Sequence, residues 1–508
     1  MRLAELLAAL SLAADLGTGA PMETTLRVCL LATRLARAVK VGGDDLAATY
    51  YTGLLWSAGC TATAHEGQVR FGDDIGLNRA MAGADFTQPT DVLRRAARIG
   101  ENWGVAGRIQ GIRGLLRYGQ MHGEDVAAFH CEAAARLASR LGLGGSVLDG
   151  LAAFFEYWNG TGGPRKLGGQ QIPFPARAAR LAYEVVQASR VETDPLVVLG
   201  SRAGGELDPL LWDSFQQHAT ELLAGLGQES IWSDALDAEP EPRAAAPLWH
   251  VDAFASAFGD FVDLKSVYWL GHSSASARLA EAAARYLGMP EADTALVSRA
   301  AHLHGLGRVA VSNRIWDKSG SLSPAEWERV RLYPYFTDRV LSRAANLTEL
   351  VRIASGAQER LDGTGYHRGL PAAAQPMTQR VVAAAASFQS MTEDRRHRPR
   401  LSSADAVLQL RAEAADGRLD KEAVAAVLEA TGHRGPRTDW PNDLTDREVE
   451  VLRLVARGHT NRQVATALTI SEETARNHVK HIYTKIGIST RAGAALFAME
   501  RGLFLPDK

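Results

Sequence analysis

The sequence is poor in cysteine and in excess charge, and each shortage excludes a class of protein. Its 508 residues include only three cysteines, Cys29, Cys60 and Cys131, and no CxxC pair. This spacing argues against a disulfide framework or a cysteine zinc site and favours a reducing compartment. The formal net charge is −2, so the chain as a whole is not a basic nucleic-acid binder, and only a local face could bind nucleic acid.

Long apolar runs are also missing. The N-terminal stretch "MRLAELLAALSLAADLG" is interrupted by Glu5 and Asp15 and has no basic region beyond Arg2. Its periodicity predicts an amphipathic helix and not a signal peptide. Because no run is long enough to span a bilayer, we expect a cytoplasmic protein without a membrane partner.

Helix-favouring residues dominate the rest of the chain. Ala, Leu, Arg and Glu recur with a spacing of roughly 3.6 residues, and alternating strand patterns are scarce, so the predicted fold class is all-α. Two stretches rich in Pro, Gly and charge predict linkers. The predicted order is a helical domain at 1–233, a linker at 234–249, a helical domain at 250–430, a linker at 431–443 and a small C-terminal domain at 444–508.

The two larger domains share a glycine loop, which suggests an internal repeat. "EYWNGTG" and "ERLDGTG" align Glu156 with Glu359 and Asn159 with Asp362. Upstream, "ATRLARAVKV" and "SARLAEAAAR" pair through a common Arg-Leu-Ala. A duplicated helical domain is the prediction, and chance likeness of Ala-rich helices is the alternative.

The C-terminal domain shows three helix starts in close succession. Thr445 with Glu448 and Thr460 with Gln463 form capping boxes, and Ser471 is an N-cap for a helix from 472 to about 486. Gly458 ends the first helix. Short helices joined by a tight turn predict a helix-turn-helix, whose second helix enters the major groove of DNA.

The third helix has an inward and an outward face. Val479, Ile482 and Ile486 face the core, so polar side chains one turn away point outward. Arg and Asn pair with base edges, whereas Lys suits phosphates. A solvated surface is the alternative, since residues 440–508 hold ten Lys and Arg against eight Asp and Glu. The predicted DNA-binding residues are Thr460, Asn461, Thr474, Arg476, Asn477, Lys480, His481 and Lys485.

This tail resembles the LuxR-type DNA-binding domain. The segments that carry the resemblance are "LTDREVEVL", "TNRQVATAL", "ISEETARNHVKHIYTKIGI" and "TRAGAALFA". The resemblance implies a four-helix domain whose last helix, at about 491–501, mediates dimerisation. Ala475 departs from the Val usual in the family.

Residues 250–415 resemble the HD-GYP branch of the HD phosphohydrolases. The segments are "GHSSASARLAEAAARYLG", "AAHLHGLGRVAVSNRIWDKSGSLSPAEWERVRLYPY", "AQERLDGTGYHRGL" and "AAASFQSMTEDRRHRP". The resemblance implies an all-helical domain in which His and Asp side chains hold two or three metal ions. The whole chain is thus predicted to be two HD-like domains followed by a LuxR-type helix-turn-helix domain.

Most of the ligand positions that the resemblance implies hold other residues. Gly305 stands where the family has the Asp that follows its histidine, here His304. Arg308 stands where the family has a lysine. The substituted ligand positions are Gly305, Tyr333, Ala357, Gln358, and Ser387 or its neighbour. In the first repeat, Phe154 and Phe155 stand where paired histidines would be, and no catalysis is assigned to it.

A few ligand candidates remain in the second domain. They are His272, His304, Glu359 and Asp362, which could hold a single weakly bound divalent metal. The alternative is structural: a hydrogen bond between helices for each His and a turn contact for each acid. The prediction is that no metal or other cofactor is required.

The sequence predicts a transcriptional regulator that is not an enzyme. It would bind double-stranded DNA as a homodimer, and its HD-like body, a pseudoenzyme, would serve for dimerisation and for sensing a small-molecule effector. The alternative is a metal-dependent phosphohydrolase that acts on a cyclic dinucleotide such as cyclic di-GMP. A third possibility is an assembly scaffold without a ligand.

Overall fold

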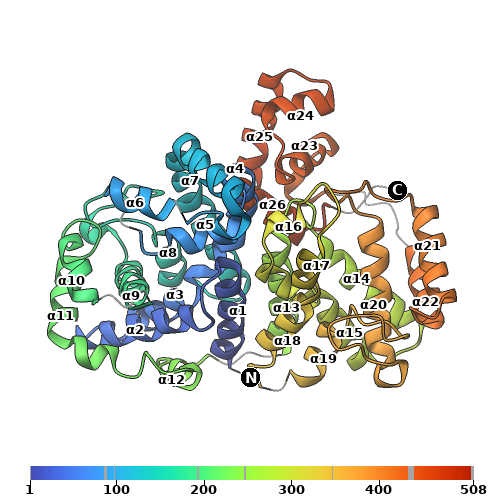
Figure 1. Cartoon of the computed structure of the whole chain (residues 1–508), viewed down its shortest axis with the longest axis horizontal. Helices are drawn as coiled ribbons and strands as arrows, with labels where there is room; N and C mark the ends of the chain where they lie inside the picture. The colour runs from blue at the N-terminus through green and yellow to red at the C-terminus, as the bar shows by residue number, and fades with distance from the viewer. Residues whose placement is uncertain are drawn as a thin grey trace. The chain divides into compact units, whose positions relative to one another are not determined.

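The chain folds almost wholly into helices (Figure 1). The computed structural model describes residues 2–84, 88–96, 98–190, 194–244, 248–345, 347–432 and 440–504. Within these ranges every named element is an α-helix or a 3-10 helix, and three isolated β-bridges are present. The all-α prediction is confirmed. In the same ranges no helix is long and apolar enough to cross a membrane.

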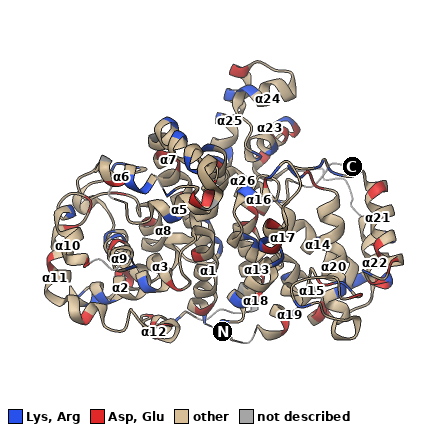
Figure 2. Ribbon diagram, in the orientation of Figure 1, with Lys and Arg blue, Asp and Glu red and all other residues tan. Residues whose placement is uncertain are grey.

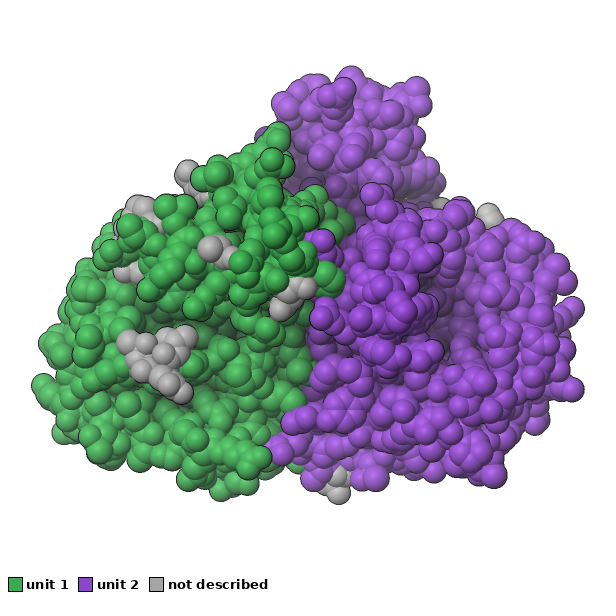
Figure 3. Space-filling model, viewed as in Figure 1, with its two compact units in different colours: residues 1–250 green, residues 251–508 purple. Residues whose placement is uncertain are grey.

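The chain divides into two compact units, Met1–His250 and Val251–Lys508 (Figure 3). Part of the predicted first linker is helical, because α12 (Trp232–Asp237) enters it and α13 (Leu248–Asp263) begins before it ends. Within the predicted second linker, residues 433–439 lie outside the described ranges. The predicted domain boundaries remain predictions.

The first unit is built around α2, which packs on α3 and α9. Its α-helices are α1 (Leu3–Thr18), α2 (Thr24–Ala38), α3 (Gly43–Leu55), α4 (Ala64–Phe71), α5 (Asp74–Met81), α6 (Pro89–Ala96), α7 (Gly104–Arg140), α8 (Ser146–Ala152), α9 (Phe174–Arg190), α10 (Pro195–Leu199), α11 (Pro209–Leu223) and α12. The helix α1 is not amphipathic as predicted. Leu6, Leu7 and Leu10 are fully buried, as are Ser11 and Asp15, so its polar residues do not form a solvent face.

The second unit has α14 at its centre, packed on α15, α20 and α22. Its α-helices are α13, α14 (His272–Tyr286), α15 (Glu291–Leu303), α16 (Asn313–Trp316), α17 (Pro324–Arg331), α18 (Tyr333–Leu341), α19 (Thr348–Ser355), α20 (Met377–Met391), α21 (Ser403–Ala415), α22 (Lys421–Thr431), α23 (Asp446–Ala456), α24 (Asn461–Leu468), α25 (Glu472–Ile486) and α26 (Arg491–Glu500).

The two glycine loops are held by the same hydrogen bonds. Glu156 and Glu359 are buried, and each carboxylate accepts backbone N–H groups nine and eleven residues later, at 2.6–3.0 Å. Asn159 and Asp362 each accept the N–H and the hydroxyl of the threonine two residues later, at 3.0 and 2.7 Å. Because both loops close in the same way, the internal repeat is a structural feature of the chain.

A second shared contact fixes the register of the repeat. The Thr25 N–H and hydroxyl donate to Asp15, at 3.1 and 2.7 Å. In the second unit the Ser273 N–H and hydroxyl donate to Asp263, at 2.7 and 2.8 Å. Thr25 near the start of α2 therefore corresponds to Ser273 near the start of α14.

The Arg-Leu-Ala pairing read from the sequence is wrong by one helical turn. It equated Arg34 with Arg278, whereas the aspartate contacts place Leu30 opposite Arg278. Two helices rich in Ala and Leu match almost equally well in two registers that differ by four residues. Four residues are about one helical turn, so the apolar faces stay aligned in either register.

The four C-terminal helices form their own apolar core. Their starts are as predicted, with complete capping boxes at Thr445 and Thr460 and with Ser471 accepting from the third helix. The buried members of this core are Leu444, Val449, Val451, Leu452, Val455, Val464, Ala465, Ala475, Ile482, Ile486, Ala494, Phe497, Ala498 and Leu503. Ala475 is fully buried, so its small side chain still faces the core.

Candidate functional sites

The outward face of α25 presents the side chains that the sequence singled out. Arg476, Asn477, Lys480 and His481 are exposed, and Figure 2 marks basic residues along α24 and α25. Arg476 lies 3.2 Å from Glu473, and both side chains are more than half exposed. Such a surface pair contributes little, so Arg476 can leave it for another acceptor.

Two of the predicted contact residues take part in helix caps: Thr460 is the N-cap of α24, and Thr474 contacts Ser471, the N-cap of α25. The Thr460 hydroxyl accepts the Gln463 N–H, and the Thr474 hydroxyl lies 2.7 Å from that of Ser471. Asn461 is half-buried at the first position of α24. These residues order the starts of α24 and α25, whose N-termini carry partial positive charge.

Lys485 has a partner inside the domain. Its Nζ lies 2.7 Å from a carboxylate oxygen of Glu448 and 3.1 Å from the carbonyl oxygen of Asp443. Against the effect of partial burial, this contact and the capping hydrogen bonds lower the pKa of Glu448. Lys485 therefore ties the end of α25 to the start of α23, a role that its place in the sequence did not suggest.

Part of the predicted dimerisation helix, α26, lies in the apolar core of the C-terminal helices, where Ala494, Phe497 and Ala498 are buried. Its role in dimerisation remains a prediction.

A second candidate site lies at the centre of the second unit, where two histidines meet an arginine. His272 begins α14, His304 follows α15, and Arg308 lies in the 3-10 turn η5 (Leu306–Ala310). The two Nε2 atoms are 3.3 Å apart, and the Arg308 Nη2 lies 3.2 Å from that of His272 and 3.1 Å from that of His304. All three side chains are buried.

The remaining ring nitrogens fix the tautomers of the two histidines. The Nδ1 of His304 lies 2.7 Å from the carbonyl oxygen of Ala301, and that of His272 lies 2.7 Å from a carboxylate oxygen of Glu393. Each Nδ1 must donate, so in the neutral ring each Nε2 carries a lone pair. Two lone pairs 3.3 Å apart repel, and the N–H groups of Arg308 Nη2 bridge them.

The charges at this centre are consistent with that assignment. Burial lowers the pKa of His272 to about 4, although Glu393 opposes the shift. Burial, together with Arg308, lowers the pKa of His304 well below its ordinary value. Burial disfavours the ionised form of Glu393, but the contacts with His272 and Arg395 hold its pKa at about 2. Both imidazoles are therefore neutral near pH 7, and Glu393 is ionised.

Trp269 separates two guanidinium groups at this centre. The Cζ atoms of Arg308 and Arg395 each lie 3.9 Å from its ring centroid. Arg395 also pairs with Glu393 at 2.7 Å. No carboxylate of the described residues forms an ion pair with Arg308, and its Nε and Nη1 are buried without a hydrogen-bond partner. The site therefore holds a buried cation with donors to spare.

Gly305 leaves room for this arginine. A Cβ atom at residue 305 would lie 2.9 Å from Nη1 and 3.1 Å from Cζ of Arg308. The guanidinium thus fills the space into which the aspartate implied by the family resemblance would extend. Gly305 and the Arg308 guanidinium therefore fit each other sterically.

The retained ligand candidates do not gather into one cluster among the described residues. The described ranges contain no group of three or more His, Cys, Asp or Glu side chains that could hold one. His272 and His304 do meet, but a guanidinium bridges them. Glu359 and Asp362, the other two candidates, hold the glycine loop and do not converge on the histidines.

Sequence reasoning missed three members of this centre, Trp269, Glu393 and Arg395. Arg308 was seen only as a replaced lysine. Its position four residues after His304 was a usable signal, since it is one helical turn away. No local signal links Glu393 to His272, because 121 residues separate them.

Two known families match the chain. They are the HD domain, at residues 257–423, and the bacterial regulatory proteins of the luxR family, at residues 442–498. The 3'3'-cGAMP-specific phosphodiesterase 3 of Vibrio cholerae is 29% identical over 437 residues, which are 84% of this chain and 94% of that protein.

Further similarities concern a solved structure and a regulator. The crystal structure of a cyclic GMP-AMP-specific phosphodiesterase from V. cholerae superposes with a TM-score of 0.58 at 25% identity, and the match covers 86% of this chain and 99% of that one. The transcriptional activator DevR/DosR of Mycobacterium tuberculosis is 35% identical over 82 residues, which are 16% of this chain and 38% of the activator.

The prediction that the chain is not an enzyme is wrong on this comparison. A relative that shares sequence over 84% of the chain is a phosphodiesterase, and so is the protein in the similar crystal structure. The prediction rested on the number of replaced metal ligands. That number does not show whether the residues of the assembled site are active together. The pseudoenzyme interpretation falls with it.

The buried histidines predict a loss of stability in acid. In the unfolded chain His272 and His304 have an ordinary pKa near 6.5, but both values are lower in the folded chain, to about 4 for His272. As pH falls from about 6.5 towards 4, the unfolded state therefore binds protons that the folded state does not, and the free energy of unfolding falls. Above pH 6.5 these groups add no pH dependence. Urea unfolding followed by tryptophan fluorescence at several pH values measures this.

A variant separates this effect from general acid unfolding. His122 and His130 in the first unit also have a pKa of about 4, lowered mainly by burial, and act in the same direction. Burial raises the pKa of Asp15 to about 7 and also raises that of Asp263, so these two carboxyls oppose the loss in the same pH range. In His304→Gln the slope between pH 6.5 and 4 should be shallower. An unchanged slope would contradict the assignment of a neutral buried His304.

Proposed function

We propose that this chain, which carries an HD domain and a luxR-family domain, is a ligand-responsive regulator that binds double-stranded DNA through α24 and α25. The observation that carries the DNA-binding part is the capped helix-turn-helix whose second helix exposes Arg476, Asn477, Lys480 and His481. A helix that places Arg and Asn on one exposed face suits base edges in the major groove.

We further propose that the regulator acts as a homodimer. A helix-turn-helix domain contacts few base pairs, and dimers gain affinity and specificity by reading two half-sites about one helical turn apart.

We propose that the HD body binds a cyclic dinucleotide at the histidine–arginine centre. The similarity to a 3'3'-cGAMP-specific phosphodiesterase names the ligand class. Arg308 would bind a phosphodiester of this ligand. Its Nε and Nη1 have no hydrogen-bond partner, and a guanidinium binds phosphate oxygens through two parallel hydrogen bonds.

Hydrolysis of that ligand is the second candidate function. The phosphodiesterase relatives favour it, as does the close approach of His272 and His304. Purified chain incubated with 3'3'-cGAMP and manganese, and analysed for linear dinucleotide, tests it directly. Turnover that stops in His304→Gln would establish it.

The DNA-binding proposal is tested by mapping the genomic sites that the chain occupies. Enriched sites with a shared, twofold-symmetric sequence are expected, and mobility shifts on those sites with and without 3'3'-cGAMP would show whether the ligand changes the affinity. Absence of sequence enrichment would refute the proposal.

A further inference from the structure

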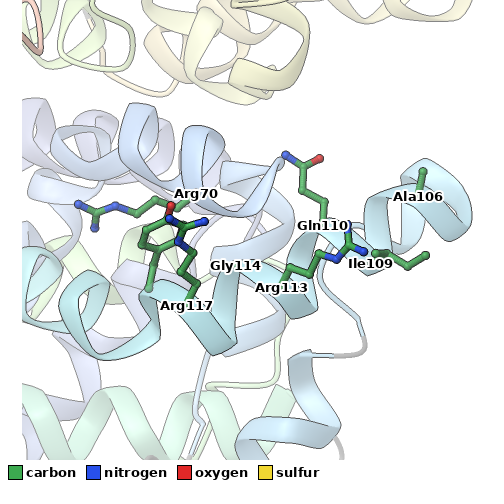
Figure 4. A pocket seen from close by; sticks show the side chains of 8 residues that line it. Arg70, Ala106, Ile109, Gln110, Arg113, Gly114 and Arg117 are labelled. Carbon is green, nitrogen blue, oxygen red and sulfur yellow. The ribbon is translucent and has the colours of Figure 1, made fainter.

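A cavity of about 440 Å³ lies between α4 and α7 in the first unit (Figure 4). Its lining includes three arginines, an amide and an aromatic ring: Arg70, Arg113, Arg117, Gln110 and Tyr118. The cavity belongs to the first unit alone and shares no residue with the histidine–arginine centre. Its volume is in the range of small-ligand pockets.

The backbone brings the two helices close enough to form this cavity. A Cβ atom at Gly114 would lie 2.5 Å from the carbonyl oxygen of Arg70 and 2.8 Å from Cδ1 of Phe71. The absence of that atom lets α7 approach the end of α4. Gln110, Arg113 and Arg117 lie on the side of α7 that faces this contact, since they recur at intervals of three and four residues.

The charge of the cavity is strongly positive. Arg70 pairs with Asp125 at 2.6 Å, which orients its guanidinium at the end of α4. No ion pair is recorded in the described ranges for Arg113 or Arg117, and both are exposed. The first five turns of α7, residues 104–123, contain no Asp or Glu at all. Two unneutralised guanidinium groups therefore face one opening.

We propose that this cavity binds a small ligand with adjacent phosphate groups, such as a nucleoside triphosphate. Guanidinium groups one helical turn apart on α7 match two neighbouring phosphates, and each forms charge-assisted hydrogen bonds with phosphate oxygens. Gln110 also lines the cavity. Ile109, which is 45% exposed at the same opening, offers apolar contact to an attached organic group.

The experiment uses the full chain and two probes, GTP and inorganic triphosphate, with binding measured by isothermal titration calorimetry. Arg113→Gln and Arg117→Gln should each weaken the binding of both probes about tenfold. Arg108→Gln is the matched control, because Arg108 is an exposed arginine of α7 that does not line the cavity. Its affinity should stay within twofold of that of the unchanged chain.

The two probes separate the two sources of affinity. Equal affinity for GTP and triphosphate would mean that the cavity recognises the phosphates alone. Tighter binding of GTP would show that the organic group also contributes to the affinity. The proposal would be overturned if neither probe bound at a concentration of about 1 mM, at which even weak binding is detected. An equal loss in Arg108→Gln would also overturn it, because the binding would then follow the net charge of α7.

This outcome is independent of the proposed cyclic dinucleotide site. Arg308→Gln should leave triphosphate binding unchanged, and Arg117→Gln should leave 3'3'-cGAMP binding unchanged. If Arg308→Gln removed triphosphate binding, the ligand would belong to the second unit and the cavity would have no role in it.

Discussion

Replacing Arg476 with alanine is expected to weaken binding to the preferred operator by roughly five- to 150-fold, or about 1–3 kcal/mol. The reason is that a guanidinium on the exposed face of α25 pairs with a base edge, so its loss also relaxes the sequence preference at one position. Fluorescence anisotropy with a set of operator sequences, each changed at one base pair, measures both effects.

Lys480→Ala should act differently, because a lysine bound to phosphate carries no sequence information. Its affinity should fall by a similar factor on every sequence, and the slope of log affinity against log salt should become shallower by about one. Arg411→Ala removes an exposed arginine of α21, outside the helix-turn-helix, and is the matched control for charge. If Arg476→Ala and Lys480→Ala both left operator binding unchanged, α25 would not be the recognition helix.

Replacing Arg308 with glutamine is expected to weaken 3'3'-cGAMP binding by about a hundredfold or more. The guanidinium is buried with two unpaired donors, and the loss of two charge-assisted hydrogen bonds in a dry site costs about 1.5–3 kcal/mol each. Calorimetric titration of the full chain measures the affinity. The control variant is Arg299→Gln, because Arg299 is a half-buried arginine that pairs with Asp252. Its affinity should equal that of the unchanged chain.

Gly305→Asp tests the same site without removing the arginine. Its carboxylate would be placed against the guanidinium, because a Cβ atom at residue 305 already lies 2.9 Å from Nη1. The neutralised arginine should lose the ligand as completely as Arg308→Gln does. Near-ultraviolet circular dichroism, which reports on the packing of the chain's ten tryptophans, Trp269 among them, checks that the variants remain folded. Tight binding by both folded variants would refute the proposed ligand site.

The glycine loops show how far the sequence alone reached at the level of motifs. The shared Glu and Asn or Asp positions predicted a repeat, and the structure gives both loops the same backbone hydrogen bonds. The same comparison misplaced α2 against α14 by one turn. Loops with fixed glycine and acid positions have a single good alignment, whereas two Ala-rich helices tolerate a shift of one turn.

In the candidate sites, too, the sequence revealed local features and missed contacts between distant segments. In the tail, each cap acts over two or three residues, and the outward face of α25 follows from helical periodicity, so the sequence located Arg476, Asn477, Lys480 and His481. It did not find the pairing of Lys485 with Glu448, because that contact joins the end of one helix to the start of another.

By itself the sequence determined the helices, their caps, the glycine loops and the helix-turn-helix, since all of these depend on residues close together in the chain. Only the tertiary structure decided what became of the retained histidines. It brings His272, Arg308 and Glu393 together, and it turns Glu359 and Asp362 towards their own loop. The physical reason is that side-chain convergence depends on how distant helices pack, and the space left by Gly305 is visible only once Arg308 is seen to fill it.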